Sequence, residues 1–485
     1  YMVNKVTKYS TLILNSNDVK YELEKAHALS THGRPGPCWI DIPMNLQSTN
    51  IQLDKVNHFK DKELPNLNLI SESDLLNNID SIIEALKSAK RPLLWLGNGI
   101  RLSGAEKLIE PLLEKYNIPA LVTWAGVDTI DSNHPLIFGR AGTYGQRCAN
   151  FILQNCDFLI CIGTRMAISQ VGYDITELAR EADIAVVDID KFELDKYKER
   201  YKYSINVDAG EFIKSLLDKE ISESLNFSNW IENCNNYKKT YPWVDENYHS
   251  DKDGFINSYK FMEKLNTYFK DDQHITTDMG TALLSGHQVL KIGKNQRLMT
   301  STGLGEMGYG LPAAIGVSIA RNKGEVICLN CDGGMMMNLQ ELQTIVHYKL
   351  PIKLFIFNND GYLMIKHTQN AIFNGRRAGV DSSSGVSCPD FSALATAFGI
   401  PSFKIKTWKD FDEVIPKVQG NKGPVICEVF MHPHQLFVPK LGLAIQSDGS
   451  LISPPLEDLS PFLPREELRR NMIHGLHSKS TIIEI

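Results

Sequence analysis

Short apolar runs alternate with helix-length segments through most of this chain, and few folds accommodate that pattern. From Ser71 to Leu216, and again from His274 to Phe430, runs rich in Leu, Ile and Val are separated by stretches with helical spacing. Strands that are buried on both faces have such continuous apolar runs, and the helices that connect them produce parallel sheets. We therefore predict an α/β chain built from doubly wound parallel sheets.

Two polar stretches without clear periodicity, at about 47–68 and 222–254, separate the alternating blocks and are interpreted as linkers. The chain before the first of these stretches has one strand–helix–strand pattern, with strands predicted at Tyr9–Leu14 and Cys38–Ile42. An α/β domain normally contains several such units. We therefore expect the sequence to start inside a domain. The predicted organisation is two complete domains at 70–220 and 255–440, the C-terminal part of a third at 1–50, and a tail at 441–485.

The composition narrows the class of partners. The 51 basic and 57 acidic residues give a net charge of −6 without any basic block, which argues against a nucleic-acid partner. No apolar run approaches the roughly 20 residues of a membrane helix, and no secretory signal is present. The nine cysteines are scattered, and we interpret Cys328 and Cys331, despite their C-x-x-C spacing, as two reduced core thiols. These features predict a cytoplasmic protein with no membrane partner.

Polar residues follow two apolar runs of the last domain, where predicted strands end. Asp332-Gly333-Gly334 follows one run and Asn359-Asp360-Gly361 the other, and the separation of 27 positions between Asp332 and Asn359 suits one crossover helix between neighbouring parallel strands. Carboxylate, amide and carbonyl oxygens are ligands that Mg²⁺ prefers. Either motif alone is typical of a turn, but the pair at this spacing favours a site for Mg²⁺ and a diphosphate.

The segment Gly303–Gly308 supports an alternative, because it has the G-x-G-x-x-G form between a predicted strand and a predicted helix. That layout is typical of a dinucleotide-binding fingerprint, so an NAD-dependent dehydrogenase is the alternative from this motif. It leaves Asn358-Asn359 unexplained.

The pair Asp332-Gly-Gly and Asn358-Asn359 resembles the metal–diphosphate motif of thiamine diphosphate enzymes. Three further segments are similar to the acetolactate synthase-like large subunits within that family, and the resemblance covers nearly the whole chain. Cys331 stands where the family motif usually begins with glycine, which we expect to matter little because the ligand is the next residue. The three segments are 33–43, 304–315 and 454–458.

The resemblance implies roles for individual residues. Asp332 and Asn359 would bind Mg²⁺ through their side chains and Gly361 through its carbonyl oxygen, and Met307 would be the apolar wedge that bends thiamine diphosphate. Ordinary core packing is the alternative for Met307, since Met commonly fills gaps. The segment from Gly280 to Gln288 resembles the diphosphate loop. The other cofactor-binding residues that the resemblance implies are His287, Gly305, Gly333, Gly334, Tyr362 and Leu363.

The implied activity is a carboligase reaction. Such an enzyme decarboxylates a 2-keto acid, here pyruvate, with the thiazolium as electron sink, and transfers the acyl unit to a second carbonyl. The segment Asn359–Gln369 departs from authentic acetolactate synthases, and the tail is more similar to homologues linked to polysaccharide clusters. The acceptor is therefore open between a keto acid and a keto-sugar. The family also implies a homodimer or homotetramer.

The predicted domain 70–220 resembles the flavin-carrying central domain of acetolactate synthases. The loop Gly139–Gly145 departs from the family form, and many relatives have lost the flavin, so both an FAD-binding and a flavin-free domain stay open. The FAD contacts that the resemblance implies are Gly97, Gly99, Arg165, Asp188 and Asp190.

The family's catalytic glutamate belongs to the pyrimidine-binding domain, of which residues 1–50 would be the C-terminal remnant. We expect that glutamate upstream of Tyr1, because Glu22 and Glu24 lie on a later predicted helix and do not match its position. The chain by itself is thus expected to catalyse poorly. A non-catalytic relative kept as a subunit is the further alternative, which the intact Asp332 and Asn359 pair opposes.

Overall fold

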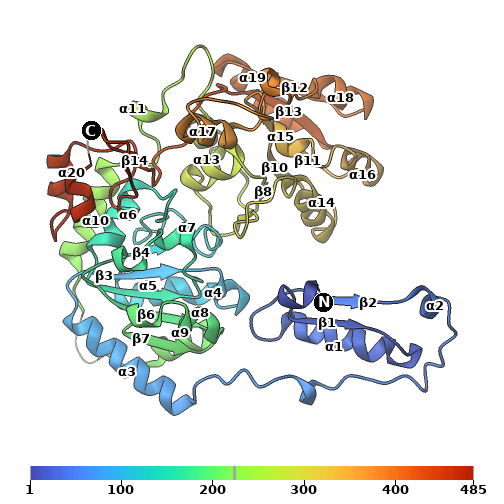
Figure 1. Cartoon of the computed structure of the whole chain (residues 1–485), viewed down its shortest axis with the longest axis horizontal. Helices are drawn as coiled ribbons and strands as arrows, with labels where there is room; N and C mark the ends of the chain where they lie inside the picture. The colour runs from blue at the N-terminus through green and yellow to red at the C-terminus, as the bar shows by residue number, and fades with distance from the viewer. Residues whose placement is uncertain (1, 222–224, 484–485) are drawn as a thin grey trace.

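The predicted domain 70–220 folds around a five-stranded parallel sheet with strand order β4-β3-β5-β6-β7 (Figure 1). The computed structural model describes residues 2–221 and 225–483. Helices cover both faces of the sheet, and the strands β3 and β5 are buried along their whole length, as their apolar runs predicted. The strands are β3 (Pro92–Leu96), β4 (Ala120–Val122), β5 (Phe158–Ile162), β6 (Asp183–Asp188) and β7 (Tyr203–Asn206). The helices are α3 (Glu72–Ser88), α4 (Gly99–Leu102), α5 (Ile109–Tyr116), α6 (Arg147–Asn155), α7 (Ile168–Val171), α8 (Lys191–Asp195) and α9 (Ala209–Asp218).

The second alternating block forms a six-stranded parallel sheet with order β12-β13-β11-β10-β8-β9. The strands β10 and β11 are direct neighbours, so the crossover predicted between them is confirmed. The strands are β8 (His274–Thr277), β9 (Arg297–Met299), β10 (Val326–Cys331), β11 (Ile352–Asn358), β12 (Ser402–Ile405) and β13 (Val425–Phe430). The helices are α12 (Ser258–Asn266), α13 (Thr281–Val289), α14 (Gly310–Ala320), α15 (Asp332–Met335), α16 (Glu341–Tyr348), α17 (Leu363–Ile372), α18 (Phe391–Ala397) and α19 (Trp408–Gly420).

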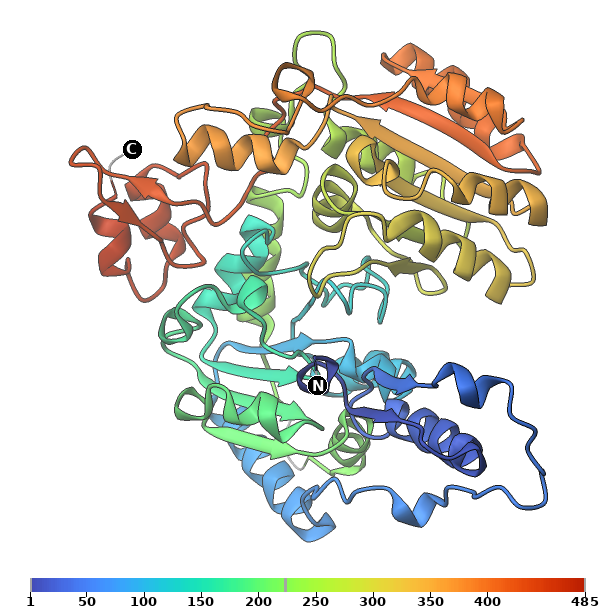
Figure 2. The ribbon, with the colours of Figure 1, turned by 45° about the vertical axis from the view of Figure 1, so that its right-hand side comes forward.

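The first residues form a small unit in which two parallel strands pack on one helix (Figures 1 and 2). Of the hydrophobic side chains at residues 2–50, Ile13 and Ala26 are buried, so this unit has little core of its own. Arg34 joins it to the central domain, because its guanidinium lies 3.1 Å from the Asp190 carboxylate and also pairs with Glu193. The elements are β1 (Tyr9–Leu12), α1 (Val19–Thr31), β2 (Cys38–Asp41) and α2 (Met44–Gln47).

The prediction of a linker at 222–254 was wrong for the described part of that stretch, whereas residues 222–224 lie outside the described residues. It contains α10 (Ser228–Thr240) and α11 (Glu246–His249). Trp230 and Cys234 lie one helical turn apart and are buried, and the Trp230 indole donates to the carbonyl of Pro92. Polar residues, mainly Asn and Lys, make up most of the rest of α10, so its apolar stripe is too narrow to stand out in the composition.

The tail packs on the central domain. Every residue of α6 is buried. The Asn150 side chain donates to the carbonyl of Leu456 at 2.7 Å, and Gln154 donates to the Glu457 carboxylate at 2.6 Å. The tail therefore covers, together with α10, the face of α6 that the sheet does not cover. Its elements are β14 (Ala444–Ile445), β15 (Leu451–Ile452), α20 (Arg465–Asn471) and α21 (Ser478–Thr481).

Two further observations bear on the sequence predictions. All nine cysteines are free thiols, and Cys328 and Cys331 are both buried, in agreement with the interpretation as core residues. None of the helices in the described part of the chain combines the length and apolar composition that a membrane crossing requires.

Candidate functional site

The carboxyl ends of β10 and β11 bring Asp332 and Asn359 together, as their spacing predicted. Cys331 pairs with Phe357 across the two strands, so the residues that follow lie at one edge of the sheet. One oxygen of the buried Asp332 carboxylate, Oδ2, accepts the backbone N–H of Asn359 at 2.9 Å and that of Gly361 at 3.0 Å. Asp332 therefore fixes the loop that carries the other two predicted metal ligands.

The donor set at this edge fits a hard cation. The Asn359 side chain donates to the Thr281 hydroxyl at 2.9 Å, but its buried Oδ1 has no hydrogen-bond partner among the described residues. An unpaired buried acceptor is costly, by about 1–3 kcal/mol. Burial of the carboxylate raises the pKa of Asp332 to about 6, and the N–H groups of Gly361, Gly333 and Asn359 oppose the rise. A divalent cation would stabilise both oxygens.

The glycine pair after Asp332 allows three side chains to approach the backbone. A Cβ on Gly333 would lie 2.4 Å from the ring of Tyr362 and 3.4 Å from the terminal methyl of Met307, and one on Gly334 would lie 2.1 Å from the Asp278 carboxylate. Any side chain at these two positions would therefore displace its neighbours. Met307 is 39% exposed, so it is a surface residue at the site and not part of the core.

Asp278 was not singled out from the sequence, yet it organises the segment that carries Met307. Both of its carboxylate oxygens accept the backbone N–H of Gly308, at 2.9 and 3.1 Å, and one accepts that of Met279. Burial raises the pKa of the Asp278 carboxyl, and these backbone donors oppose the rise. The carboxylate thus fixes the turn beside Met307. Its signal in the sequence is its place directly after the run His274–Thr277, the position that Asp332 holds after its own strand.

The two ends of the predicted diphosphate loop, residues 280–288, lie in different surroundings. Gly280 precedes α13, and a Cβ there would lie 3.3 Å from the Sγ of Cys331, which also accepts the N–H of Ala282. This end of α13 borders the metal edge. Leu363 begins α17 on the other side of the loop and is buried in the core.

His287 and Gln288 lie at the far end of α13, about 9 Å further along the helix from Thr281. The ring of His287 stacks on that of Trp124 with centroids 5.0 Å apart, and the Gln288 amide donates to the carbonyl of Pro439. The carbonyls of both residues accept donors from the central domain, namely Arg140 and Gln146. Their contacts join the two large domains.

Protonation of His287 provides a test of this interface. Burial, and secondly the charge of Arg140, lower the pKa of His287 to about 3 from 6.5. Between pH 6.5 and about 3, the unfolded chain binds a proton at His287 and the folded chain does not. The stabilisation of the fold by neutral His287 is therefore complete above pH 6.5. It is lost as the pH falls from 6.5 toward 3, by about 2 kcal/mol between pH 7 and pH 5. We expect His287→Phe, which keeps an aromatic ring on Trp124, to remove this part of the pH dependence in urea unfolding.

The exposed His27 provides the control, because His27→Phe should leave the pH dependence of unfolding unchanged. An equally steep loss of stability below pH 6.5 in the original protein and in His287→Phe would contradict the assignment.

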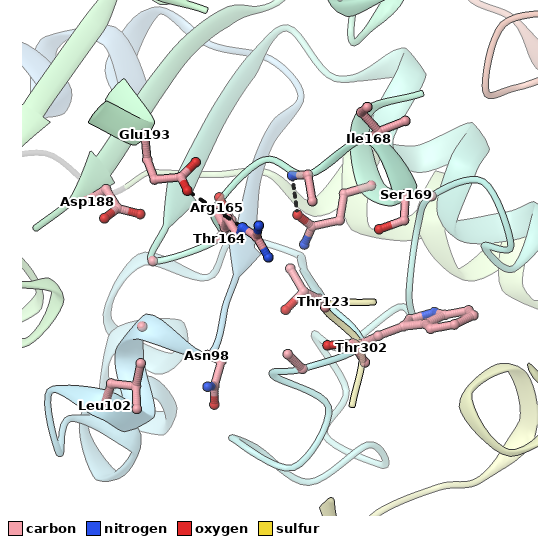
Figure 3. A pocket seen from close by; sticks show the side chains of 18 of the residues that line it. Asn98, Leu102, Thr123, Thr164, Arg165, Ile168, Ser169, Asp188, Glu193 and Thr302 are labelled. Carbon is pink, nitrogen blue, oxygen red and sulfur yellow. Dashed lines mark hydrogen bonds and ion pairs between the residues drawn. The ribbon is translucent and has the colours of Figure 1, made fainter. Parts of the chain in front are cut away.

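A cavity of about 1110 Å³ lies over the carboxyl ends of the central strands (Figure 3). Its wall comes from the first unit, the central domain and the loop 301–305 of the last domain, with Thr302 opposite the central strands. Thr164 lines it, with its Oγ1 buried beside the thiol of Cys161. The volume fits a dinucleotide-sized ligand.

The residues predicted to contact FAD differ in their placement. Gly99, Arg165 and Asp188 line the cavity, and the Arg165 guanidinium lies 3.6 Å from the Glu193 carboxylate. Gly97 instead allows β3 to approach β5, since a Cβ there would lie 2.1 Å from the carbonyl oxygen of Gly163. Asp190 caps α8 by accepting the N–H of Phe192, besides pairing with Arg34.

Comparison with known proteins identifies matches to both large domains. Residues 79–216 match the family model "Thiamine pyrophosphate enzyme, central domain", and residues 278–429 match "Thiamine pyrophosphate enzyme, C-terminal TPP binding domain". The second match contains Asp278, Met307, Asp332 and Asn359.

Relatives over most of the chain include a probable acetolactate synthase large subunit of Methanococcus aeolicus, 32% identical over 88% of this chain and 72% of the relative. The acetolactate synthase large subunit of Porphyra purpurea is 32% identical over 87% of this chain and 71% of the relative. That of Lactococcus lactis is 29% identical over 91% and 74%.

Proposed function

The chain belongs to the thiamine pyrophosphate enzyme family, and on that premise we propose that it is a carboligase of the acetolactate synthase type. Its reaction would be the decarboxylation of a 2-keto acid, with pyruvate as donor, and transfer of the acyl unit to a second carbonyl. The observation that supports this best is the edge of the sheet where Asp332, the unpaired Asn359 oxygen and Met307 lie around the Gly333-Gly334 backbone.

Each part of this edge would have a separate task. Asp332, Asn359 and the Gly361 carbonyl would hold Mg²⁺, which in turn binds the diphosphate. Bound thiamine diphosphate supplies an electron sink for loss of CO₂. Asp278 keeps the Met307 turn in place, and Met307 together with Tyr362 would exclude water and support the bent cofactor.

Calorimetry and a turnover assay test the proposal on the full-length protein. We expect thiamine diphosphate to bind only when Mg²⁺ is present, and pyruvate to be consumed with release of CO₂. Tight binding of NADH with no affinity for thiamine diphosphate would overturn the proposal in favour of a dehydrogenase. Binding of thiamine diphosphate without turnover of any 2-keto acid would instead favour a non-catalytic relative.

Met307→Ala should lower kcat by about tenfold or more while changing the affinity for thiamine diphosphate by less than about threefold. The expectation follows because a residue that enforces a reactive conformation acts on the rate more than on binding. Steady-state kinetics and cofactor titration of the same preparation measure the two effects. Ile319→Ala, on the exposed side of α14, is the control and should change neither. Equal losses of rate and affinity would show that Met307 only contributes to binding.

FAD is the ligand that we propose for the central cavity. Its volume and the position of Arg165 at the wall support a ligand with a diphosphate, since Arg binds such groups bidentately. The purified protein should show flavin absorbance near 450 nm after incubation with FAD and removal of the excess. A colourless protein after this treatment would favour the flavin-free alternative.

A keto-sugar acceptor is the second candidate within the same chemistry. The observation that favours it is the segment Asn359–Gln369, which contains the metal loop and most of α17 and departs from authentic acetolactate synthases. Rapid formation of acetolactate from pyruvate alone would count against this acceptor. Slow turnover of pyruvate alone that rises on addition of a keto-sugar would support it.

We also propose a homodimer or homotetramer. Large apolar side chains are exposed around the proposed thiamine site, and such patches commonly mark interfaces. They include Leu304, Met307, Tyr309, Met336 and Met337. Light scattering measures the assembly, and a monomer at micromolar concentration would contradict the proposal.

A further inference from the structure

The loop Asn358–Gly361 joins β11 to α17, and the three carbonyl groups of Asn359, Asp360 and Gly361 have different partners. Lys366, one turn into α17, donates from its Nζ to the carbonyl of Asn359 at 3.3 Å and to that of Asp360 at 2.5 Å. The carbonyl of Gly361 accepts only the nearby N–H of Leu363 at 3.1 Å, among the hydrogen bonds of the described residues.

One peptide group of this loop forms hydrogen bonds through both its carbonyl and its N–H. The carbonyl of Asp360 and the N–H of Gly361 belong to the same planar trans peptide and point in opposite directions. The carbonyl accepts a hydrogen bond from the Lys366 ammonium, while the N–H donates to Asp332. Rotation of this peptide would therefore break both charge-assisted hydrogen bonds, each stronger than a bond between neutral groups.

Lys366 is buried, with 1% of its surface exposed, although lysine rarely occupies such positions. Its Nζ lies 4.0 Å from the carboxylate of Asp381, which also pairs with Arg377 at 2.7 Å. The two carbonyls and Asp381 thus surround an ammonium that has three donors. A side chain that only filled space would not need this set of partners.

We propose that Lys366 is a positioning residue that selects which backbone carbonyl of the loop is available to the cation. It holds the carbonyls of Asn359 and Asp360 and leaves that of Gly361 as the backbone ligand. The inference rests on the proposed function, because it concerns the same magnesium site. Its consequence is metal selectivity: Mg²⁺ requires near-ideal octahedral geometry, whereas Ca²⁺ accepts variable numbers and directions of oxygen ligands.

The test compares Lys366→Met with Lys353→Met in the full-length protein. Lys353 is a matched control, since it is a lysine 2% exposed on β11 whose Nζ also donates to two carbonyls, those of Asn421 and Gly423, near the opposite end of that strand. Mg²⁺ and Ca²⁺ are titrated separately by calorimetry in the presence of the same fixed excess of thiamine diphosphate. For Lys366→Met we expect about a tenfold or larger loss of Mg²⁺ affinity and a much smaller loss of Ca²⁺ affinity. Lys353→Met should lower the melting temperature without changing the ratio of the two affinities.

A conservative variant completes the test. Lys366→Arg keeps the charge and the donors, so it should retain most of the Mg²⁺ preference, and Lys366→Gln replaces Lys366→Met if the latter does not fold. An unchanged ratio of Mg²⁺ to Ca²⁺ affinity in the Met or Gln variant overturns this inference alone. An original protein that binds thiamine diphosphate without any need for a divalent cation overturns the proposed function and the inference together.

Discussion

Replacing Asp332 with asparagine should reduce the Mg²⁺-dependent affinity for thiamine diphosphate by about a hundredfold or more, because loss of even an outer partner of a metal ligand costs about 10–100-fold. Asp332 would supply the negative charge of the metal site, and its two oxygens also accept the N–H groups of Gly333, Asn359 and Gly361. An asparagine amide would place its NH₂ group against either the N–H of Gly333 or the N–H groups of Asn359 and Gly361, so that donors would face each other. Titration of the cofactor at several Mg²⁺ concentrations measures the effect.

Asp360→Asn is the matched control, since Asp360 is an exposed acid in the same loop that is not a proposed ligand. It should bind thiamine diphosphate nearly as the original protein does. If Asp332→Asn retained the original affinity at every Mg²⁺ concentration, the assignment of the metal site would be refuted.

Gly97→Ala should destabilise the central domain by about 3 kcal/mol or more, at the upper end of the cost of overpacking. The added Cβ would lie 2.1 Å from the carbonyl oxygen of Gly163 and 2.5 Å from the Cα of Thr164. Both are backbone atoms at the end of β5, so the two central strands would have to separate. Thermal and urea unfolding followed by circular dichroism measure the loss, and the floor of the cavity should be disturbed with it.

Gly316→Ala in α14 is the control, because a Cβ there meets nothing within 4 Å and alanine favours a helix by about 1 kcal/mol over glycine. It should be as stable as the original protein or slightly more so. Equal unfolding midpoints for the two variants would show that the strands can accommodate the methyl group.

The architecture was predictable from the sequence where burial is complete. The strands β3 and β5 are buried on both faces, and their uninterrupted apolar runs identified them directly. The helix α10 was missed because it buries Trp230 and Cys234 and is otherwise mostly polar. The helix α17 was missed because its burial does not follow its hydrophobicity: Ile365 and Ile372 are exposed, whereas Lys366 is buried. A narrow apolar stripe does not show in the composition of a segment.

The candidate site was predictable where a residue directly follows a strand. Asp332 and Asn359 do so, and the parallel neighbours β10 and β11 bring them to one edge. Thr281 and Lys366 were not found, because they reach the loop from helices that fold back onto it. His287 was placed in the diphosphate loop, whereas tertiary packing directs its ring onto Trp124 of another domain.

The attachment of the tail to α6 has a consequence for synthesis on the ribosome. Asn150 and its partner Leu456 are 306 residues apart in the chain. At a translation rate of about 5–20 residues per second, roughly 15–60 s pass between the synthesis of α6 and the synthesis of the tail residues that pack on it. During that time a nascent chain with a folded central sheet lacks Leu463 and Leu468, which complete the apolar cluster around Phe151 and Cys148 that Tyr241 of α10 covers only in part. We therefore expect chaperone demand during synthesis to concentrate on the central domain, although that domain has the larger core.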